Sequence, residues 1–148
     1  MLPENIELQI VTPERHVLAE TVQGVEVPGK EGYLGVLPGH APLLTELGIG
    51  VLSYRNEAET RYLSVILGYA EVLPDRVIVL AEAAERAEEI DVERARRDRE
   101  QAQAEMAKAS SGSPEWLRAE EAVQRATVRL QAAAKAGAVE REAAHAAS

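Results

Sequence analysis

The first part of the chain alternates apolar and polar side chains with a period of two. Ile6, Leu8 and Ile10 are separated by single polar residues, so their side chains share one face of an extended strand. Further short apolar runs, separated by turn residues, follow at 22–27, 51–54, 62–66, 70–73 and 77–80. Strands at such close spacing leave no room for the crossover helices of a parallel sheet. The pattern therefore predicts an antiparallel β-sandwich or barrel.

Beyond residue 86 the spacing changes to steps of three and four, which is the period of a helix. The first stripe is Val92, Ala95, Arg99, Ala102, Met106 and Ala109, and the second is Trp116, Ala119, Val123, Ala126, Leu130 and Ala133. Asp91 suits the N-cap of the first helix, and Ser113 with Pro114 suits the start of the second. Gly137 can end that helix. These patterns predict an antiparallel two-helix hairpin followed by a short C-terminal tail.

Both stripes consist mainly of alanine, and each methyl-sized group buried contributes only ~0.8 kcal/mol. Helices of this length are marginal without packing. We therefore expect the hairpin to dock weakly enough for a ligand or partner to release it. The alternative is a permanently folded two-helix appendage.

Composition and charge change near residue 87. Eight of the ten glycines and six of the seven prolines precede it. Residues 1–86 carry six basic and thirteen acidic side chains, whereas residues 87–148 carry ten and twelve. The sequence thus predicts an α+β chain with a sandwich domain over 1–86 and a helical hairpin domain with a short tail over 87–148.

Several classes of function are disfavoured. The net charge of −9 argues against a nucleic-acid-binding protein, and the absence of cysteine excludes disulfides and thiolate metal sites. No leader peptide or long apolar run is visible, so we expect neither secretion nor membrane insertion. The histidines lie far apart at 16, 40 and 145, and no Gly-x-Ser-x-Gly motif occurs. We predict no catalytic residue and no metal site.

One glycine-rich segment imitates a phosphate-binding loop. Residues 24–31 nearly match G-x-x-x-x-G-K-[ST], but Glu31 occupies the hydroxyl position. Gly32 and Gly35 follow where a helix would have to begin, so no helix N-terminus faces a phosphate. We interpret this segment as an exposed turn between strands.

Four further motifs are found along the chain. Residues 32–47 read Gly-Tyr-Leu-Gly-Val-Leu-Pro-Gly-His-Ala-Pro-Leu-Leu-Thr-Glu-Leu, residues 10–15 read Ile-Val-Thr-Pro-Glu-Arg, and residues 67–72 read Leu-Gly-Tyr-Ala-Glu-Val. Residues 90–95, Ile-Asp-Val-Glu-Arg-Ala, match the pattern I/L-D-x-x-R-A. With residues 118–130, these motifs closely resemble the epsilon subunit of the bacterial F-type ATP synthase. About the last ten residues have no counterpart.

This resemblance implies a non-catalytic rotor subunit on the cytoplasmic face of the bacterial membrane. It implies that the sandwich binds the gamma subunit and the membrane c-ring. The helices would inhibit ATP hydrolysis by exchanging the hairpin for an extended arm that reaches the catalytic alpha and beta subunits. The interface residues would be Lys30, Glu31 and Tyr33 at the ring and Arg118 on the arm. His40, between Gly39 and Ala41, would hydrogen-bond either within its turn or at the stalk interface. The alternative is a free-standing ATP-sensing or scaffold protein built on the same two domains.

The arginines of the second helix allow three interpretations. Arg118, Arg125 and Arg129 are spaced by seven and four residues, so they share one face. They could be solvated partners of Glu120, Glu121 and Asp98, they could bind an anion such as a triphosphate, or they could contact acidic surfaces of the catalytic head.

The resemblance also implies a regulatory ATP, because some bacterial epsilon subunits bind it through I/L-D-x-x-R-A and arginines of both helices. The matching positions here are Glu85, Asp91, Arg94, Ala95, Arg125 and Arg129. Gln101 stands where the ATP-binding relatives carry a further arginine, which predicts weakened phosphate binding. No cofactor is otherwise required.

Overall fold

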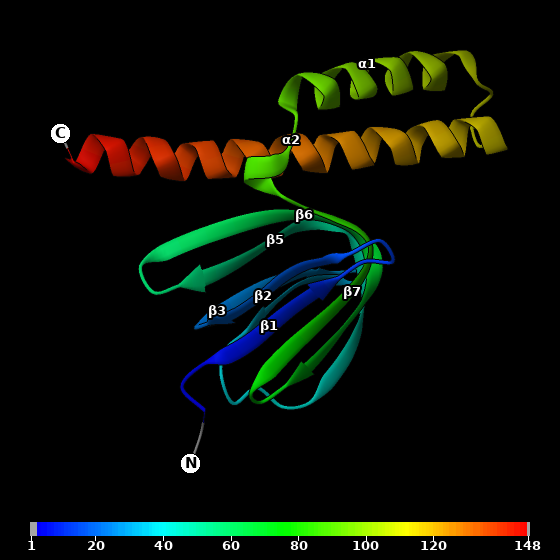
Figure 1. The fold of residues 1–148 in the computed structure, drawn as a ribbon. Coiled ribbons are helices and arrows are strands. Elements are labelled where there is room, and N and C mark those ends of the chain that lie inside the picture. Colours follow the sequence, from blue (N-terminus) through cyan, green and yellow to red (C-terminus); the bar gives the residue numbers. More distant parts are fainter. Residues whose placement is uncertain (1–2, 148) are drawn as a thin grey trace.

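A computed structural model describes residues 3–147, which form seven strands, one 3-10 turn and two helices (Figure 1). The strands are β1 (Ile6–Val11), β2 (His16–Val22), β3 (Gly24–Gly29), β4 (Gly32–Val36), β5 (Leu43–Asn56), β6 (Glu59–Leu73) and β7 (Arg76–Arg86). The turn η1 (Ala87–Glu89) leads to α1 (Val92–Lys108) and α2 (Pro114–Ala147). A β-sandwich followed by a helical hairpin is therefore confirmed.

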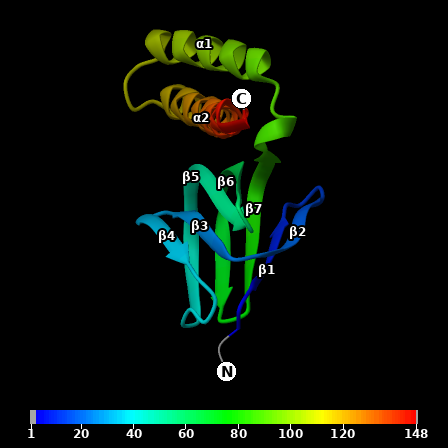
Figure 2. The same ribbon diagram turned by 90° about the vertical axis from the view of Figure 1, so that its left-hand side faces the viewer.

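The seven strands form one sheet in the order β2-β1-β7-β6-β5-β3-β4, which folds back over its own core (Figure 2). One pairing differs from the antiparallel prediction. β1 and β7 run parallel, from Glu7 opposite Arg76 to Val11 opposite Leu80. No crossover helix is needed, because the other five strands of the domain form the connection between them.

β6 joins two of the predicted short strands into one long strand. Leu63 and Val65 face the sandwich core before residue 67, and Ala70 and Val72 face it afterwards. Since side chains alternate along a strand, this change from odd to even positions requires the strand to turn over. It does so at Leu67 and Gly68, which have φ values of 52° and 124°.

Gly68 is needed at this bend for steric reasons. A Cβ atom at residue 68 would lie 2.0 Å from the carbonyl oxygen of Leu80 on β7. The glycine therefore bends the strand without ending it. Before the bend, Ile66 and Ser64 are left on the outer face of the sheet, beneath the helices.

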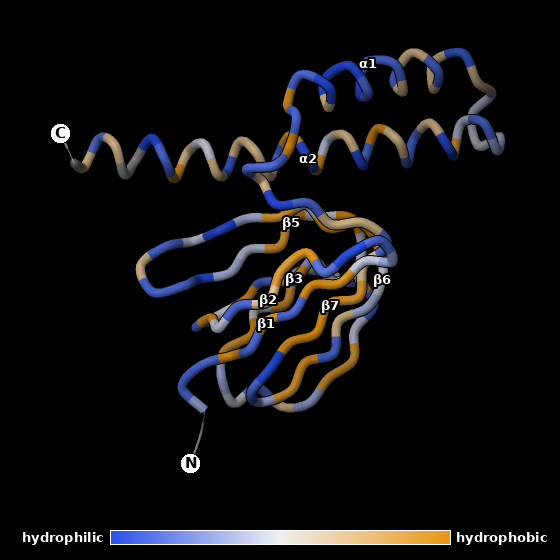
Figure 3. The backbone as a smooth tube through the Cα atoms, viewed as in Figure 1, coloured by the Kyte–Doolittle hydropathy of each residue, from blue (hydrophilic) through white to orange (hydrophobic). Residues whose placement is uncertain are grey.

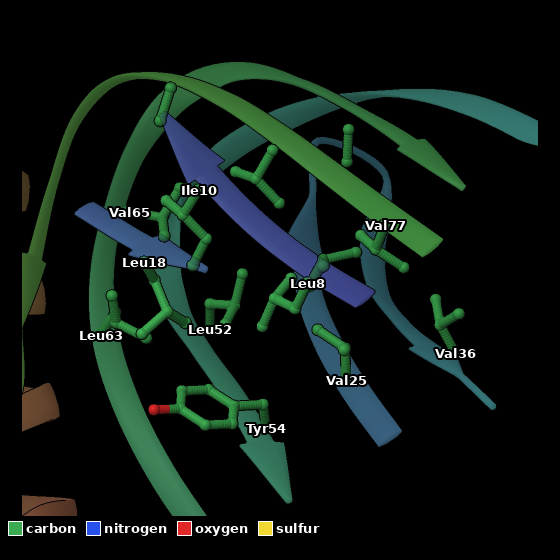
Figure 4. Close-up of a cluster of buried hydrophobic side chains, with 14 of the residues drawn as sticks. Leu8, Ile10, Leu18, Val25, Val36, Leu52, Tyr54, Leu63, Val65 and Val77 are labelled. Atoms are coloured by element: carbon green, nitrogen blue, oxygen red, sulfur yellow. The ribbon is translucent and has the colours of Figure 1, made fainter. Parts of the chain in front are cut away.

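The core inside the sandwich is almost wholly aliphatic, as Figure 4 shows. Tyr54 is its one aromatic member among the described residues, and its hydroxyl donates to Glu20 Oε2 over 2.6 Å. Asn56 Nδ2 donates to the other oxygen of Glu20 over 3.1 Å. This network ties β2 to β5. At the C-terminal end of β7, the Arg86 side chain donates to the carbonyl oxygen of Val17 over 2.8 and 3.1 Å.

The helix caps agree with the sequence prediction. Asp91 Oδ1 accepts from the Arg94 backbone N–H over 3.1 Å, and Ser113 Oγ accepts from Trp116 N–H over 3.2 Å. Ala95 and Ala102 of the first stripe are buried, as are Ala119 and Ala126 of the second. In both views α2 lies between α1 and the sheet (Figures 1 and 2). Figure 3 shows that the strongest hydrophobic residues are concentrated in the strands.

The predicted end of the second helix at Gly137 is wrong, because α2 continues to Ala147. A single glycine costs a helix only about 1 kcal/mol relative to alanine. Its neighbours in the sequence are strong helix formers, such as Ala136, Ala138 and Glu140. The predicted short tail is thus the end of the helix, and Ser148 lies outside the described residues.

The Tyr54–Glu20 hydrogen bond should be measurable as stability. We expect Tyr54→Phe to lower the free energy of unfolding by about 1–2 kcal/mol, since the partly buried Glu20 loses one of its two donors. Denaturant unfolding followed by circular dichroism measures this change. Tyr69→Phe is the matched control, because Tyr69 is exposed and its hydroxyl has no hydrogen bond within residues 3–147. Equal losses in the two variants would contradict the assignment.

The same hydroxyl should give the stability a dependence on high pH. Burial, and then the hydrogen bond to Glu20 and its charge, raise the pKa of Tyr54 above its ordinary value of 10.0. The folded state therefore keeps a proton that the unfolded state releases. This stabilising contribution is complete below pH 10 and is lost as the pH rises toward the folded pKa. Tyr54→Phe should show a smaller decline in stability above pH 10.

Candidate functional site

A cavity of about 660 Å³ lies between the sandwich and the helical hairpin. Its floor is the outer face of β6 and β7, which contributes Ser64, Ile66, Ala83 and Glu85. Its roof comes from both helices, and the β1–β2 turn at 12–15 closes one side. We call this space the hairpin cavity. It is the right size for a small ligand, since ligand pockets commonly have about 300–1,000 Å³.

Two arginines of α2 form ion pairs across the hairpin cavity to β7. Arg129 Nε lies 2.9 Å from Glu85 Oε1, and Arg129 Nη1 lies 3.7 Å from Asp98 of α1. Arg125 Nη2 lies 3.5 Å from Glu82 and 3.3 Å from Glu121. The Arg129 and Glu85 side chains are only 21% and 30% exposed, so water screens this pair less than a surface pair. These pairs attach the hairpin to the sandwich.

The structure brings together only some of the residues predicted to bind ATP. Glu85, Arg125 and Arg129 line the hairpin cavity, and Gln101 lines it as well. Gln101 donates to Glu105 over 3.4 Å.

The other three predicted residues lie outside the described lining. Asp91 caps α1, and Ala95 is buried completely. Arg94 is exposed and forms no ion pair within residues 3–147. In this docked arrangement, therefore, the I/L-D-x-x-R-A residues serve to start and pack α1.

Arg118, Arg125 and Arg129 differ in solvent exposure, and they do not all line the cavity. Glu121 and Asp98 are partners of Arg125 and Arg129, as the solvated interpretation expects, but Arg129 is mostly buried. Arg118 is exposed and lies 3.8 Å from Glu115. It contributes nothing to the described lining of the cavity.

Sequence reasoning missed two polar residues of the cavity. Arg15 reaches it from the β1–β2 turn, and Arg15 Nη2 lies 3.0 Å from Glu89 Oε2 on η1. Ser64 is 2% exposed, and its hydroxyl has no hydrogen-bond partner within residues 3–147. The signal for Ser64 was a single hydroxyl in the apolar run 63–67. Arg15 belongs to the motif at 10–15, but nothing in that motif indicated the cavity, because only the fold brings the turn to the helices.

The lining holds more acidic than basic groups. Arg15, Arg125 and Arg129 are its described cations, and its described carboxylates are Glu14, Glu82, Glu85, Asp98 and Glu105. Three positive charges thus face five negative ones. An anionic ligand would have to compete with these carboxylates for the guanidinium groups.

A small apolar contact beside the cavity completes the docking of the hairpin. Val128 and Ala132 of α2 are buried against Val51, Ile66, Ala87 and Ile90. The predicted stripes did not include Val128 or Ala132, because they lie on a different face of α2 from the one that meets α1. We call this cluster the docking contact. It uses the outer surface that the bend at Gly68 provides.

Of the five predicted interface residues, Arg118 lies on α2, and the other four lie on the sandwich outside the described lining of the cavity. Lys30 Nζ is 3.5 Å from Glu46 Oε2, Glu31 is exposed, and the exposed ring of Tyr33 accepts a hydrogen bond at its hydroxyl from Val51 N–H over 3.1 Å. His40 donates through Nδ1 to the Ala41 carbonyl oxygen over 2.7 Å, as expected for a turn residue. Residues 24–31 form β3 and a turn, in agreement with the rejection of a phosphate loop.

Residues 3–147 hold neither a metal-binding cluster nor a membrane-spanning helix. No group of three or more His, Asp or Glu side chains is placed to hold a metal ion. None of the described helices is both long and apolar enough to span a membrane.

The fold defines a class of protein in which a closed β-sandwich carries a docked antiparallel helical hairpin. Comparison with known families identifies the class. The family model for the ATP synthase delta/epsilon chain beta-sandwich domain matches residues 5–87, and the model for the long alpha-helix domain of the same chain matches residues 88–134. The chain therefore belongs to the ATP synthase delta/epsilon chain family. By family, it is a non-catalytic subunit of ATP synthase.

Individual relatives agree. The ATP synthase epsilon chain of Syntrophobacter fumaroxidans is 49% identical over 134 residues, covering 90% of this chain and 99% of the relative. That of Koribacter versatilis is 53% identical over 102 residues, covering 69% and 72%.

Solved structures show the same architecture. A chain in the OSCP/F1/c-ring structure of the Euglena gracilis mitochondrial ATP synthase has a TM-score of 0.77 and 26% identity, covering 90% of this chain and 83% of its own. A chain in the Tetrahymena thermophila central stalk/c-ring structure has a TM-score of 0.54, 14% identity and coverages of 86% and 96%, and it supports the fold alone.

The docking contact should be sensitive to one buried charge. We expect Ala132→Glu to release the hairpin, because its carboxylate would be buried among Val51 and Ile66 without a partner, at a cost of several kcal/mol. Limited trypsin digestion should then cleave after Arg94 faster than in the parent protein. Ala134→Glu is the matched control, since Ala134 is exposed on the same helix. If both variants are cleaved at the parent rate, α2 does not depend on this contact.

Proposed function

We propose that this chain is a rotor subunit of the central stalk, on the cytoplasmic face of the membrane, where its sandwich binds the gamma subunit and the c-ring. Family membership and the OSCP/F1/c-ring complex that contains one of its structural neighbours support this role. An exposed apolar patch on the sheet also supports it. Leu44, Tyr69 and Leu80 lie on the neighbouring strands β5, β6 and β7, and each is more than half exposed. Such a patch marks a surface for protein contact.

The helical hairpin would inhibit ATP hydrolysis by leaving the sandwich and inserting between the catalytic alpha and beta subunits. The observation that carries this proposal is the form of docking: on its own side of the contact, α2 contributes Val128 and otherwise alanines, and the ion pairs are reached in part by water. A partner surface could replace both kinds of contact. The arm would also be long, because the 34 residues of α2 extend for about 50 Å as a helix.

Removal of the helices tests the inhibitory role. We expect the assembled ATP synthase that carries residues 1–87 of this chain to hydrolyse ATP faster than the parent enzyme and still to synthesise ATP. The core of the sandwich involves β1–β7 alone, so the fragment should remain folded and attached. Steady-state hydrolysis by the purified complex, with gamma and c-ring retention checked by pull-down, measures the effect. Unchanged hydrolysis under both resting and activating conditions would rule out inhibition by the helices.

ATP would regulate this exchange by binding in the hairpin cavity and holding the hairpin closed. Glu85, Arg125 and Arg129 already meet there, and guanidinium groups bind phosphate through paired hydrogen bonds. A triphosphate would have to displace Glu82 and Glu85 from the arginines, so the affinity should be modest. Asp91, Arg94 and Ala95 would join the site if α1 shifted toward the ligand.

Calorimetry on the isolated protein tests the ATP site. We expect Arg125→Ala to weaken ATP binding about ten- to a hundredfold, through loss of a charged hydrogen bond. Gln101→Arg should tighten it, because it adds a cation to an acidic lining. Arg118→Ala is the control, since Arg118 lies outside the described lining. No heat with millimolar ATP in either the parent or Gln101→Arg would overturn the ATP proposal and leave the stalk proposal intact.

A further inference from the structure

The floor of the hairpin cavity carries a polar group that the folded protein leaves unused. The Ser64 hydroxyl is on a side chain that is 98% buried, and it has no hydrogen-bond partner within residues 3–147. No buried side-chain nitrogen or oxygen within residues 3–147 lacks a partner, so the Ser64 hydroxyl is open to the solvent in the cavity. Ser64 lines the cavity, where a ligand could supply the missing hydrogen bond. This hydroxyl adds a hydrogen-bonding position on the cavity floor to the arginines of the lining.

The two arginines of α2 do not by themselves give this site a free positive charge. Arg129 uses Nε and Nη2 on Glu85 and places Nη1 near Asp98, so each of its nitrogens faces a carboxylate. Arg125 is paired with Glu82 as well as Glu121. Glu82, Glu85 and Asp98 all line the cavity, so their charges offset the guanidinium groups locally. α1 contributes no cation to the described lining.

Arg15 differs from the two helical arginines in the position of its partner. It pairs with Glu89, which is not part of the described lining, and it uses only Nη2 in that pair. A guanidinium carries five N–H donors, so several remain for a ligand. The turn that carries Arg15 is fixed by hydrogen bonds from Thr12 N–H to the Arg15 carbonyl oxygen over 2.9 Å and from Arg15 N–H to Thr12 Oγ1 over 3.3 Å. Its backbone position is therefore set before any ligand arrives.

We infer that Arg15 and Ser64 belong to the ligand site of the hairpin cavity, where Arg15 binds a phosphate group of a nucleoside polyphosphate and Ser64 bonds it from the floor. This inference rests on the proposed ATP function and assigns two residues outside its predicted set. Arg15 supplies a cation from the sandwich opposite those of α2. A ligand held between them would link the two parts of the chain directly, which is the requirement for a nucleotide that keeps the hairpin docked.

Calorimetric titration of the full-length protein with ATP tests the inference. We expect Arg15→Ala to weaken ATP binding about tenfold, and Arg15→Lys to recover part of the loss. Ser64→Ala should weaken it about threefold to tenfold, because a single neutral hydrogen bond is lost. Titration with inorganic triphosphate separates the two contacts. Arg15→Ala should reduce its binding too, which places Arg15 on the phosphates.

Two controls separate ligand binding from structural effects. Arg76→Ala removes an exposed arginine beside Asp75, at the start of β7, and should leave the affinity unchanged. Glu89→Ala breaks the same ion pair as Arg15→Ala but keeps the guanidinium, so ATP should bind at least as tightly as to the parent.

The possible results separate the roles of Arg15 and Ser64 from the existence of the ATP site. ATP binding by the parent that is unaffected in Arg15→Ala and Ser64→Ala would overturn the assignment of these residues and leave the ATP site standing. Equal weakening in Arg15→Ala and Glu89→Ala would show that Arg15 acts only by holding η1, which also overturns it. Absence of ATP binding in both the parent and Gln101→Arg would overturn the assignment of Arg15 and Ser64 together with the proposed ATP site.

Discussion

The arrangement of this protein depends on one steric constraint, the close approach of β6 to β7 at Gly68. No side chain fits there, because a Cβ would meet the carbonyl oxygen of Leu80. With glycine at this position β6 turns over without ending. The residues before the bend and those after it therefore present opposite faces of the strand to the sandwich core. The half before the bend gains an outward surface that carries Ile66 and Ser64. The docking contact and the cavity floor are both built on that surface.

The hairpin is attached by two kinds of interaction that respond differently to their surroundings. The apolar contact around Val128 and Ala132 has no charge for salt to screen, whereas the pairs of Arg125 and Arg129 with β7 weaken as ionic strength rises. The carboxylates of β7 occupy the positions that an anionic ligand would take on these arginines. A ligand of the kind proposed would thus compete with intramolecular pairing for the same donors. Such competition would make the docked state of the hairpin adjustable.

Much of the fold could be predicted from sequence because it is encoded locally. The stripes through Ala95 and Ala119 and the caps at Asp91 and Ser113 depend only on nearby residues. The parallel pairing of β1 with β7 and the placement of Arg15 beside the helices depend on contacts between distant segments. Gly137 was misleading because a local preference of about 1 kcal/mol was outweighed by its helix-forming neighbours. The resemblance led to the correct family, yet only half of its expected ATP residues meet in the cavity.

The parallel pairing of β1 with β7 has a consequence for how the chain folds. Glu7 lies opposite Arg76, so β1 can pair with β7 only after nearly the whole sandwich domain has been synthesised. Closing so long a loop is slow, because its entropy is lost before the contact is gained. During synthesis, β1 and β2 can form no more than a two-stranded hairpin until β7 leaves the ribosome. The helices emerge last, so their docking surface on β5 and β6 can already be complete when α2 appears.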